Sequence, residues 1–206
     1  MVQYPQSAPY QSLSAKDEDN VSDILKNPAR ICEMHIDITR PLFKKCTSLR
    51  EESLKYLQLT TLDIRTTERL VLPGDFLGGS TPRLRVIHLD DTAFPTLPRL
   101  LSSSTNLVSL RLEKIPPEGY FTPGDLAIGL STATQLESLK IGFQNGVFTP
   151  HRQRLDDFPP SPPRIVLPAL VEFQFTGEDT YLDDFASRID ASITEQIGVM
   201  RYLRTM

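Results

Sequence analysis

The sequence predicts an α/β solenoid: a curved, parallel β-sheet of about six strands, with short helices and loops on the convex side. The first observation is a recurring pattern, L-x-x-L-x-L, whose copies begin at residues 31, 54, 84, 107, 136 and 170. The second is their separation by 23, 30, 23, 29 and 34 residues, which leaves room for one strand and one return segment per copy. The third is the alternation of apolar and polar residues inside each copy, which is typical of a half-buried strand.

The last two apolar residues of each copy lie on the same face of the predicted strand. No single repeat can bury such a face, and parallel stacking of repeats buries all of them in one continuous core. The copies are Ile31-Cys-Glu-Met34-His-Ile36, Leu54-Lys-Tyr-Leu57-Gln-Leu59, Leu84-Arg-Val-Ile87-His-Leu89, Leu107-Val-Ser-Leu110-Arg-Leu112, Leu136-Glu-Ser-Leu139-Lys-Ile141 and Leu170-Val-Glu-Phe173-Gln-Phe175.

Three parts follow one another along the chain. Residues 1–29 are polar and offer little apolar surface, so we expect them to be disordered. Residues 30–178 form the repeats, with a proline-rich loop insertion at 144–168. Residues 179–206 form a C-terminal amphipathic helix and tail. Its apolar residues, three or four apart, are Leu182, Phe185, Ile189 and Ile193.

The return segments carry helix signals of their own. Thr122 is expected to cap a helix that has Pro123 at its first position and Asp125 near its positive end. An earlier short helix is predicted to face inward with Leu97, Leu100 and Leu101.

Composition excludes several classes of protein. A net charge of −4 argues against a dedicated nucleic-acid binder, which would carry a basic surface. No run of 18 apolar residues is present to span a membrane, and the first 20 residues lack the features of a signal peptide. With only Cys32 and Cys46, a disulfide framework is not expected, so the compartment should be reducing: the cytoplasm, the nucleus or both.

The polar residues that alternate with the core form three rows across the predicted strands. The central row is His35, Gln58, His88, Arg111, Lys140 and Gln174, and the row after it is Asp37, Thr60, Asp90, Glu113, Gly142 and Thr176. The row before it is Glu33, Tyr56, Val86, Ser109, Ser138 and Glu172. One interpretation is that these are solvated strand residues whose charges pair with one another. The other is a charge-striped site for a protein segment.

The candidate protein-binding residues come from these rows. They are His35, Asp37, Tyr56, Gln58, His88, Asp90, Arg111, Glu113, Lys140, Glu172 and Gln174. The sequence predicts an unidentified protein target, and neither a nucleic acid nor a membrane as partner.

No constellation for catalysis is found. His35 and His88 share a row but lack a third metal ligand, and Cys32 next to core residues is expected to be an inert thiol. We therefore expect no enzymatic activity, no cofactor and no metal. The proline-rich stretch at 158–163, Phe-Pro-Pro-Ser-Pro-Pro, is read either as a spacer or as a polyproline ligand for an aromatic groove.

The repeats resemble leucine-rich repeats, and their irregular spacing is most similar to the repeats of F-box-type proteins of basidiomycete fungi. The stretches that carry the resemblance are YLQLTTLD, LPGDFLGGSTPRLRVIHLDDTAFPTLPRLLSSSTNLVSLRLEKI, FTPGDLAIGLSTATQLESLKIGF and PALVEFQFTGEDTYLDDFASRIDA. They cover about residues 30–192. The asparagine that often closes the family's strand motif is missing, and no F-box is found in this sequence.

The resemblance implies the substrate-recognition region of a ubiquitin-ligase receptor. A ligase adaptor would be a partner only if an F-box were present, and none is seen. Two alternatives stay open: a stand-alone scaffold or inhibitor built from leucine-rich repeats, and a truncated, non-functional member of the family. A hydrolase on an unusual scaffold is the third and weakest interpretation.

Overall fold

The computed structural model describes residues 31–40, 43, 58–74, 76–79, 81–144, 164–190 and 197–201. The predicted disorder of residues 1–29 and most of the predicted loop at 144–168 lie outside these residues. So do Leu54, Tyr56 and Leu57 of the predicted second strand.

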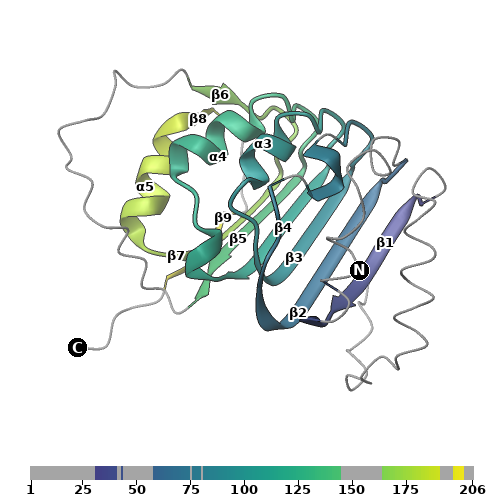
Figure 1. Cartoon of the computed structure of the whole chain (residues 1–206). Helices are drawn as coiled ribbons and strands as arrows, with labels where there is room; N and C mark the ends of the chain where they lie inside the picture. Colours follow the sequence, from purple (N-terminus) through teal and green to yellow (C-terminus); the bar gives the residue numbers. More distant parts are fainter. Residues whose placement is uncertain are drawn as a thin grey trace, which may run out of the picture.

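Within the described residues, seven parallel strands form one sheet, in the chain order β1-β2-β3-β4-β5-β7-β9 (Figure 1). The α/β class and the parallel sheet are confirmed, with one strand more than the predicted six. The strands are β1 (Glu33–Ile38), β2 (Thr61–Val71), β3 (Val86–Ala93), β4 (Ser109–Ile115), β5 (Ser138–Phe143), β7 (Glu172–Gly177) and β9 (Ile197–Arg201). Two short strands, β6 (Ile165–Val166) and β8 (Ile189–Asp190), pair separately in parallel. The residues of β6 fall inside the predicted loop insertion.

The described helices lie along one side of the sheet (Figure 1). They are η3 (Phe76–Gly79), α3 (Leu97–Leu101), η4 (Pro117–Gly119), α4 (Pro123–Leu130) and α5 (Asp179–Arg188). The predicted helix start at Thr122 is confirmed: its side chain accepts a hydrogen bond from the amide of Asp125 at 3.0 Å, and the Asp125 carboxylate accepts one from the amide of Thr122 at 3.3 Å. This reciprocal pair satisfies donors that the first turn leaves free.

The core lies between the strands and these helices. The inward pairs of β2, β3, β4, β5 and β7 are at most 3% exposed, and they are Leu62 and Ile64, Ile87 and Leu89, Leu110 and Leu112, Leu139 and Ile141, and Phe173 and Phe175. On β1, Met34 is 7% exposed and Ile36 is partly buried. The three leucines of α3 that were predicted to face inward are at most 2% exposed. Because a strand alternates its side chains, burial of this face turns the intervening polar residues to the other face.

The second strand lies five residues later than predicted. Thr61 pairs with Glu33 and with Val86, so Leu62 and Ile64 take the inward places and Asp63 takes the central row. The prediction that Gln58 belongs to this row is wrong: Gln58 precedes β2, and its side-chain carbonyl accepts a hydrogen bond from Arg83 at 3.0 Å. Thr60 also precedes the strand, and the register gives Thr61 the row that was assigned to Tyr56.

The C-terminal helix is shorter than predicted. It ends at Arg188, because Ile189 pairs with Ile165 in β6 and β8 instead of continuing the helical stripe. Further along, Ile197–Arg201 forms β9 beside β7. Ile193, the last apolar residue of the predicted stripe, lies outside the described residues. Pairing with distant strands has overridden a local helical pattern here.

Successive strands enter the sheet with the same backbone hydrogen bonds. Ahead of β2, β3, β4, β5 and β7, one backbone carbonyl of the preceding repeat accepts hydrogen bonds from the amides of two consecutive residues. The accepting residues are Cys32, Thr60, Arg85, Val108 and Glu137, and the donor pairs begin at Thr60, Arg85, Val108, Glu137 and Val171. The repeated pattern makes these positions structurally equivalent.

A tight turn precedes β3, β4, β5 and β7, and each turn ends in a buried leucine. The amides of Leu84, Leu107, Leu136 and Leu170 donate to the carbonyls three residues earlier, at Thr81, Ser104, Ala133 and Leu167. Neighbouring turns also contact each other, since the hydroxyl oxygens of Thr81 and Ser104 lie 3.3 Å apart. The turns fix where each strand begins.

Candidate functional site

The candidate site is the face of the sheet that points away from the helices, which we call the polar face. Its central row is set by the strand register and consists of His35, Asp63, His88, Arg111, Lys140 and Gln174. These side chains are half-buried or exposed. Within the described residues, no helix covers this face.

The Asp63 carboxylate is the first centre of the polar face. Arg65 donates to both of its oxygens, at 3.2 and 3.1 Å, and Nδ1 of His88 lies 3.1 Å from Oδ1. Nδ1 of His35 lies 3.5 Å from Oδ2. Partial burial by itself raises the pKa of Asp63, but the hydrogen bonds and charges of His88 and Arg65 outweigh it and hold the pKa well below its usual range. Asp63 therefore stays ionised.

The Glu113 carboxylate is the second centre, one strand beyond His88. Its Oε2 lies 2.7 Å from Nε of Arg111 and 3.2 Å from Nε2 of His88, and its Oε1 lies 2.8 Å from Nζ of Lys140. Burial again raises the pKa, but Arg111 and Lys140 more than offset it and lower the pKa of Glu113 to about 2.

His88 connects the two centres. Its ring is 15% exposed, and each ring nitrogen faces a carboxylate oxygen, Asp63 on β2 and Glu113 on β4. Both nitrogens can donate only when the ring carries two protons. In that form a continuous set of charge-assisted contacts crosses four neighbouring strands, from Arg65 to Lys140.

A bulge in β4 places one further cation. The pairing of β4 with β5 shifts between Leu112 and Ile115, and Lys114 has a positive φ of 49°. Its ammonium lies 3.1 Å from Oδ1 of Asp90 on β3, and the hydrogen bond that it donates to this carboxylate raises the pKa of Lys114. A left-handed lysine costs on the order of 1 kcal/mol, which this ion pair helps to offset.

The two ends of the polar face differ in how their carboxylates are bonded to neighbouring side chains. On β7, Glu172 accepts hydrogen bonds from the hydroxyl of Ser138 at 2.9 Å and from Gln174 at 2.8 Å. On β1, Nε2 of His35 lies 3.8 Å from Oε2 of Glu33, and Asp37 makes no ion pair with any residue that the structure describes. The carboxylates of β1 are thus the least engaged.

The structure brings together most of the predicted site residues. His35, His88, Arg111, Lys140 and Gln174 share the central row, and Asp37, Asp90, Glu113 and Glu172 flank it. Sequence reasoning missed Asp63, which lies in the overlapping frame Leu59-Thr-Thr-Leu62-Asp-Ile64, and Arg65, which directly follows that frame. The signal was available, because a copy that begins at residue 59 lies 25 residues before the copy at 84 (84 − 59) and gives a more even spacing.

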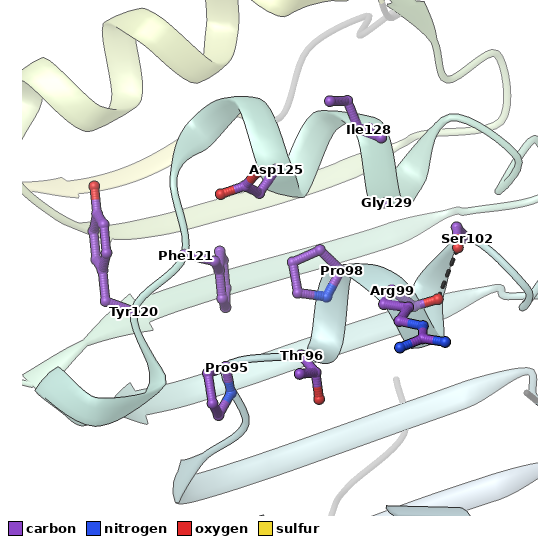
Figure 2. Close-up of a pocket in the computed structure, with 10 residues that line it drawn as sticks. All are labelled: Pro95, Thr96, Pro98, Arg99, Ser102, Tyr120, Phe121, Asp125, Ile128 and Gly129. Atoms are coloured by element: carbon purple, nitrogen blue, oxygen red, sulfur yellow. Dashed lines mark hydrogen bonds between the residues drawn. The ribbon is translucent and has the colours of Figure 1, made fainter. Parts of the chain in front are cut away.

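A second surface feature lies between α3 and α4, on the opposite side of the sheet. It is an open, shallow groove of about 400 Å³, lined by Pro95, Pro98, Tyr120, Phe121 and Ile128 among others. Figure 2 shows Phe121 and Pro98 next to each other in its middle. Ile128 is 60% exposed beside it. No pattern in the sequence indicated this groove.

Gly129 sets the distance between the two helices at the groove. A Cβ at this position would lie 2.7 Å from the carbonyl oxygen of Pro98 and 2.9 Å from its Cα. Both contacts are with backbone, so α3 and α4 would have to separate to admit any side chain.

No group of three or more His, Cys, Asp or Glu side chains among the described residues could hold a metal ion. Among the described helices, none combines the length and the apolar character needed to cross a membrane.

Comparison with known proteins gave no match, whether with family models, with curated proteins or with solved structures.

Proposed function

We propose that the chain is a leucine-rich-repeat solenoid that binds another protein on its polar face and has no enzymatic activity. The solenoid is supported by the strand order, which follows the chain, and by the hydrogen bonds that recur ahead of β2, β3, β4, β5 and β7. The buried turn leucines supply the same apolar contact in repeat after repeat.

One observation carries the binding function. Charged side chains that are fixed by mutual contacts point outward from neighbouring strands, on a face that no described helix covers. Ion pairs near a surface contribute little to stability, typically about 0–1 kcal/mol. Charges that are already oriented lose little conformational freedom when a partner arrives, so they favour specific recognition.

A narrower form of the proposal is substrate recognition for a ubiquitin ligase, and it rests on the resemblance to F-box-type repeat proteins. The stand-alone scaffold or inhibitor is the alternative. The two differ in one observable: only the ligase receptor associates with the ligase adaptor. Both use the same binding face.

The test is affinity capture from a basidiomycete lysate with the full chain and two matched variants. Arg111→Gln with Lys140→Gln removes two positive charges from the polar face, and Arg99→Gln with Arg164→Gln removes two exposed charges elsewhere. Thermal unfolding of both variants establishes that they fold.

Proteins that the wild type and the Arg99/Arg164 variant recover, and that the Arg111/Lys140 variant loses, are the expected result. Equal recovery by all three chains would overturn binding at the polar face. Presence of the ligase adaptor among the recovered proteins favours the receptor form, and its absence favours the stand-alone form.

A further inference from the structure

The charges of the polar face are unevenly distributed over the strands. Of the carboxylates on β1, β2 and β3, four lie in the three rows of the polar face, namely Glu33, Asp37, Asp63 and Asp90. Two cations reach them: Arg65 binds Asp63, and Lys114 binds Asp90. With His35 and His88 neutral, four negative charges against two positive charges leave these rows with a net charge of −2 at this end. The surplus is accessible, since Glu33 is 66% exposed and Asp37 is also exposed.

The middle of the polar face has the opposite surplus. On β4 and β5, Arg111 and Lys140 share the single carboxylate of Glu113. Arg111 contacts Glu113 only through Nε. Its two terminal guanidinium nitrogens donate no hydrogen bond to any described residue, so they can donate to a partner. Two positive charges against one leave a net charge of +1, and the Arg111 and Lys140 side chains are 40% and 33% exposed.

We propose that the polar face binds an extended protein segment with one acidic and one basic residue at a set spacing. The acidic residue lies over Arg111 and Lys140, where the terminal guanidinium nitrogens of Arg111 donate two parallel hydrogen bonds to its carboxylate. The basic residue lies over the exposed carboxylates Glu33 and Asp37. This inference rests on the proposed binding function and adds the chemistry of the partner.

The strand spacing determines how far apart the two residues are. Neighbouring strands lie about 4.8 Å apart, so β1 is about 14 Å from β4 and about 19 Å from β5. An extended chain advances about 3.3–3.6 Å per residue. A segment that crosses the strands therefore needs its acidic and basic residues about four to six positions apart.

The charge distribution disfavours the other occupants of an open sheet face. A nucleic acid presents phosphates at every step, and those over β1–β3 would meet the surplus of carboxylates there. A purely basic segment would place a cation over Arg111 and Lys140. Only a segment of mixed charge meets attraction at both ends.

The probe is a library of randomised peptides displayed on phage, selected for binding to the full chain. We expect enriched peptides to carry an acidic and a basic residue four to six positions apart. Arg111→Gln with Lys140→Gln should weaken their binding on the order of tenfold or more, and Arg99→Gln with Arg164→Gln should leave it unchanged.

A charge reversal gives the second readout. Selection of the same library on Arg111→Glu with Lys140→Glu should replace the acidic residue of the peptides by a basic one. Asp37→Asn preserves shape and removes one of the carboxylates on β1, so it should weaken the original peptides by a few fold.

The outcomes separate this inference from the proposed function. Peptides whose binding depends on Arg111 and Lys140 but that lack the paired charges would overturn the inference and leave protein binding at this face in place. A library that yields no peptide dependent on the polar face would overturn both.

Discussion

The two faces of the same strands use their residues differently. On β4, Leu110 is fully buried against the helices, whereas its neighbour Arg111 is 40% exposed and bonded to Glu113. Burial of a leucine side chain contributes about 1.5–3 kcal/mol, whereas a half-exposed ion pair contributes about 0–1 kcal/mol. The helix-covered face therefore provides most of the stability of the fold. Residues of the polar face contribute little to stability, so they can serve to recognise a partner.

The largest difference in stability between the two faces is expected from a pair of neighbouring substitutions. Leu110→Ala should lower the free energy of unfolding by about 2–5 kcal/mol, because it leaves a cavity in the core. Arg111→Ala should lower it by at most about 1 kcal/mol. Urea denaturation of both variants measures the difference. Equal losses would mean that the polar face holds the fold together as strongly as the core.

Gly129→Ala tests the helix-covered side by overpacking. The added methyl group meets the backbone of Pro98, so α3 and α4 must separate, at a cost of about 1–3 kcal/mol. The matched control is Gly124→Ala on the same helix, where the nearest atom to the new Cβ is 3.5 Å away, in the side chain of Arg188. Thermal unfolding should show a much larger decrease for Gly129→Ala than for the control.

Lowering the pH should weaken the ion pairs of the polar face and so reduce the free energy of unfolding. The pKa of Glu113 falls from an ordinary 4.5 to about 2, and that of Asp63 is also lowered from 3.8. The stability that these carboxylates contribute is complete above their unfolded-state values and is lost as the pH falls through the folded-state values. Unfolding free energies measured between pH 6 and pH 2 should therefore decrease.

The control for the acid effect is Glu113→Gln, which cannot titrate at this position. Its stability should fall less steeply over the same range, with a difference of about 1 kcal/mol after solvent screening. Parallel pH profiles for the two chains would mean that the contacts of Glu113 contribute nothing to stability.

The smallest effect is expected at Asp37. Its exposed carboxylate pairs with no described residue, so Asp37→Asn should change the free energy of unfolding by less than about 0.5 kcal/mol. Chemical denaturation measures the change. A larger loss would show that Asp37 supports the fold, and it would contradict the claim that the polar face contributes little to stability on β1.

Several elements could be predicted from local pattern alone. Four copies of the strand motif, at 84, 107, 136 and 170, have one good alignment each, and their inward residues are buried as predicted. The start of α4 was equally clear, because it depends only on neighbouring residues. The side chains of Thr122 and Asp125 accept hydrogen bonds from backbone amides of the first turn, and Pro123 suits the first helical position. The polar row through His35, His88, Arg111 and Lys140 followed from the strand period.

The second repeat could not be placed in this way. Two frames of the same pattern overlap at Leu59, one ending there and one beginning there. Pairing of Thr61 with its neighbours on both sides selects the later frame. A shift of five residues changes which residues face outward, and so Asp63 replaced Gln58 in the site.

The sequence by itself determined that this chain forms parallel strands with one apolar and one polar face, since a period of two residues is a local property. Only the tertiary structure decided the register of β2, the end of α5 and the existence of β9, because each depends on hydrogen bonds to strands far away in the chain. It also decided that His88 lies between Asp63 and Glu113. Contacts across strands are set by neighbours that no single segment contains, and the candidate site is made of such contacts.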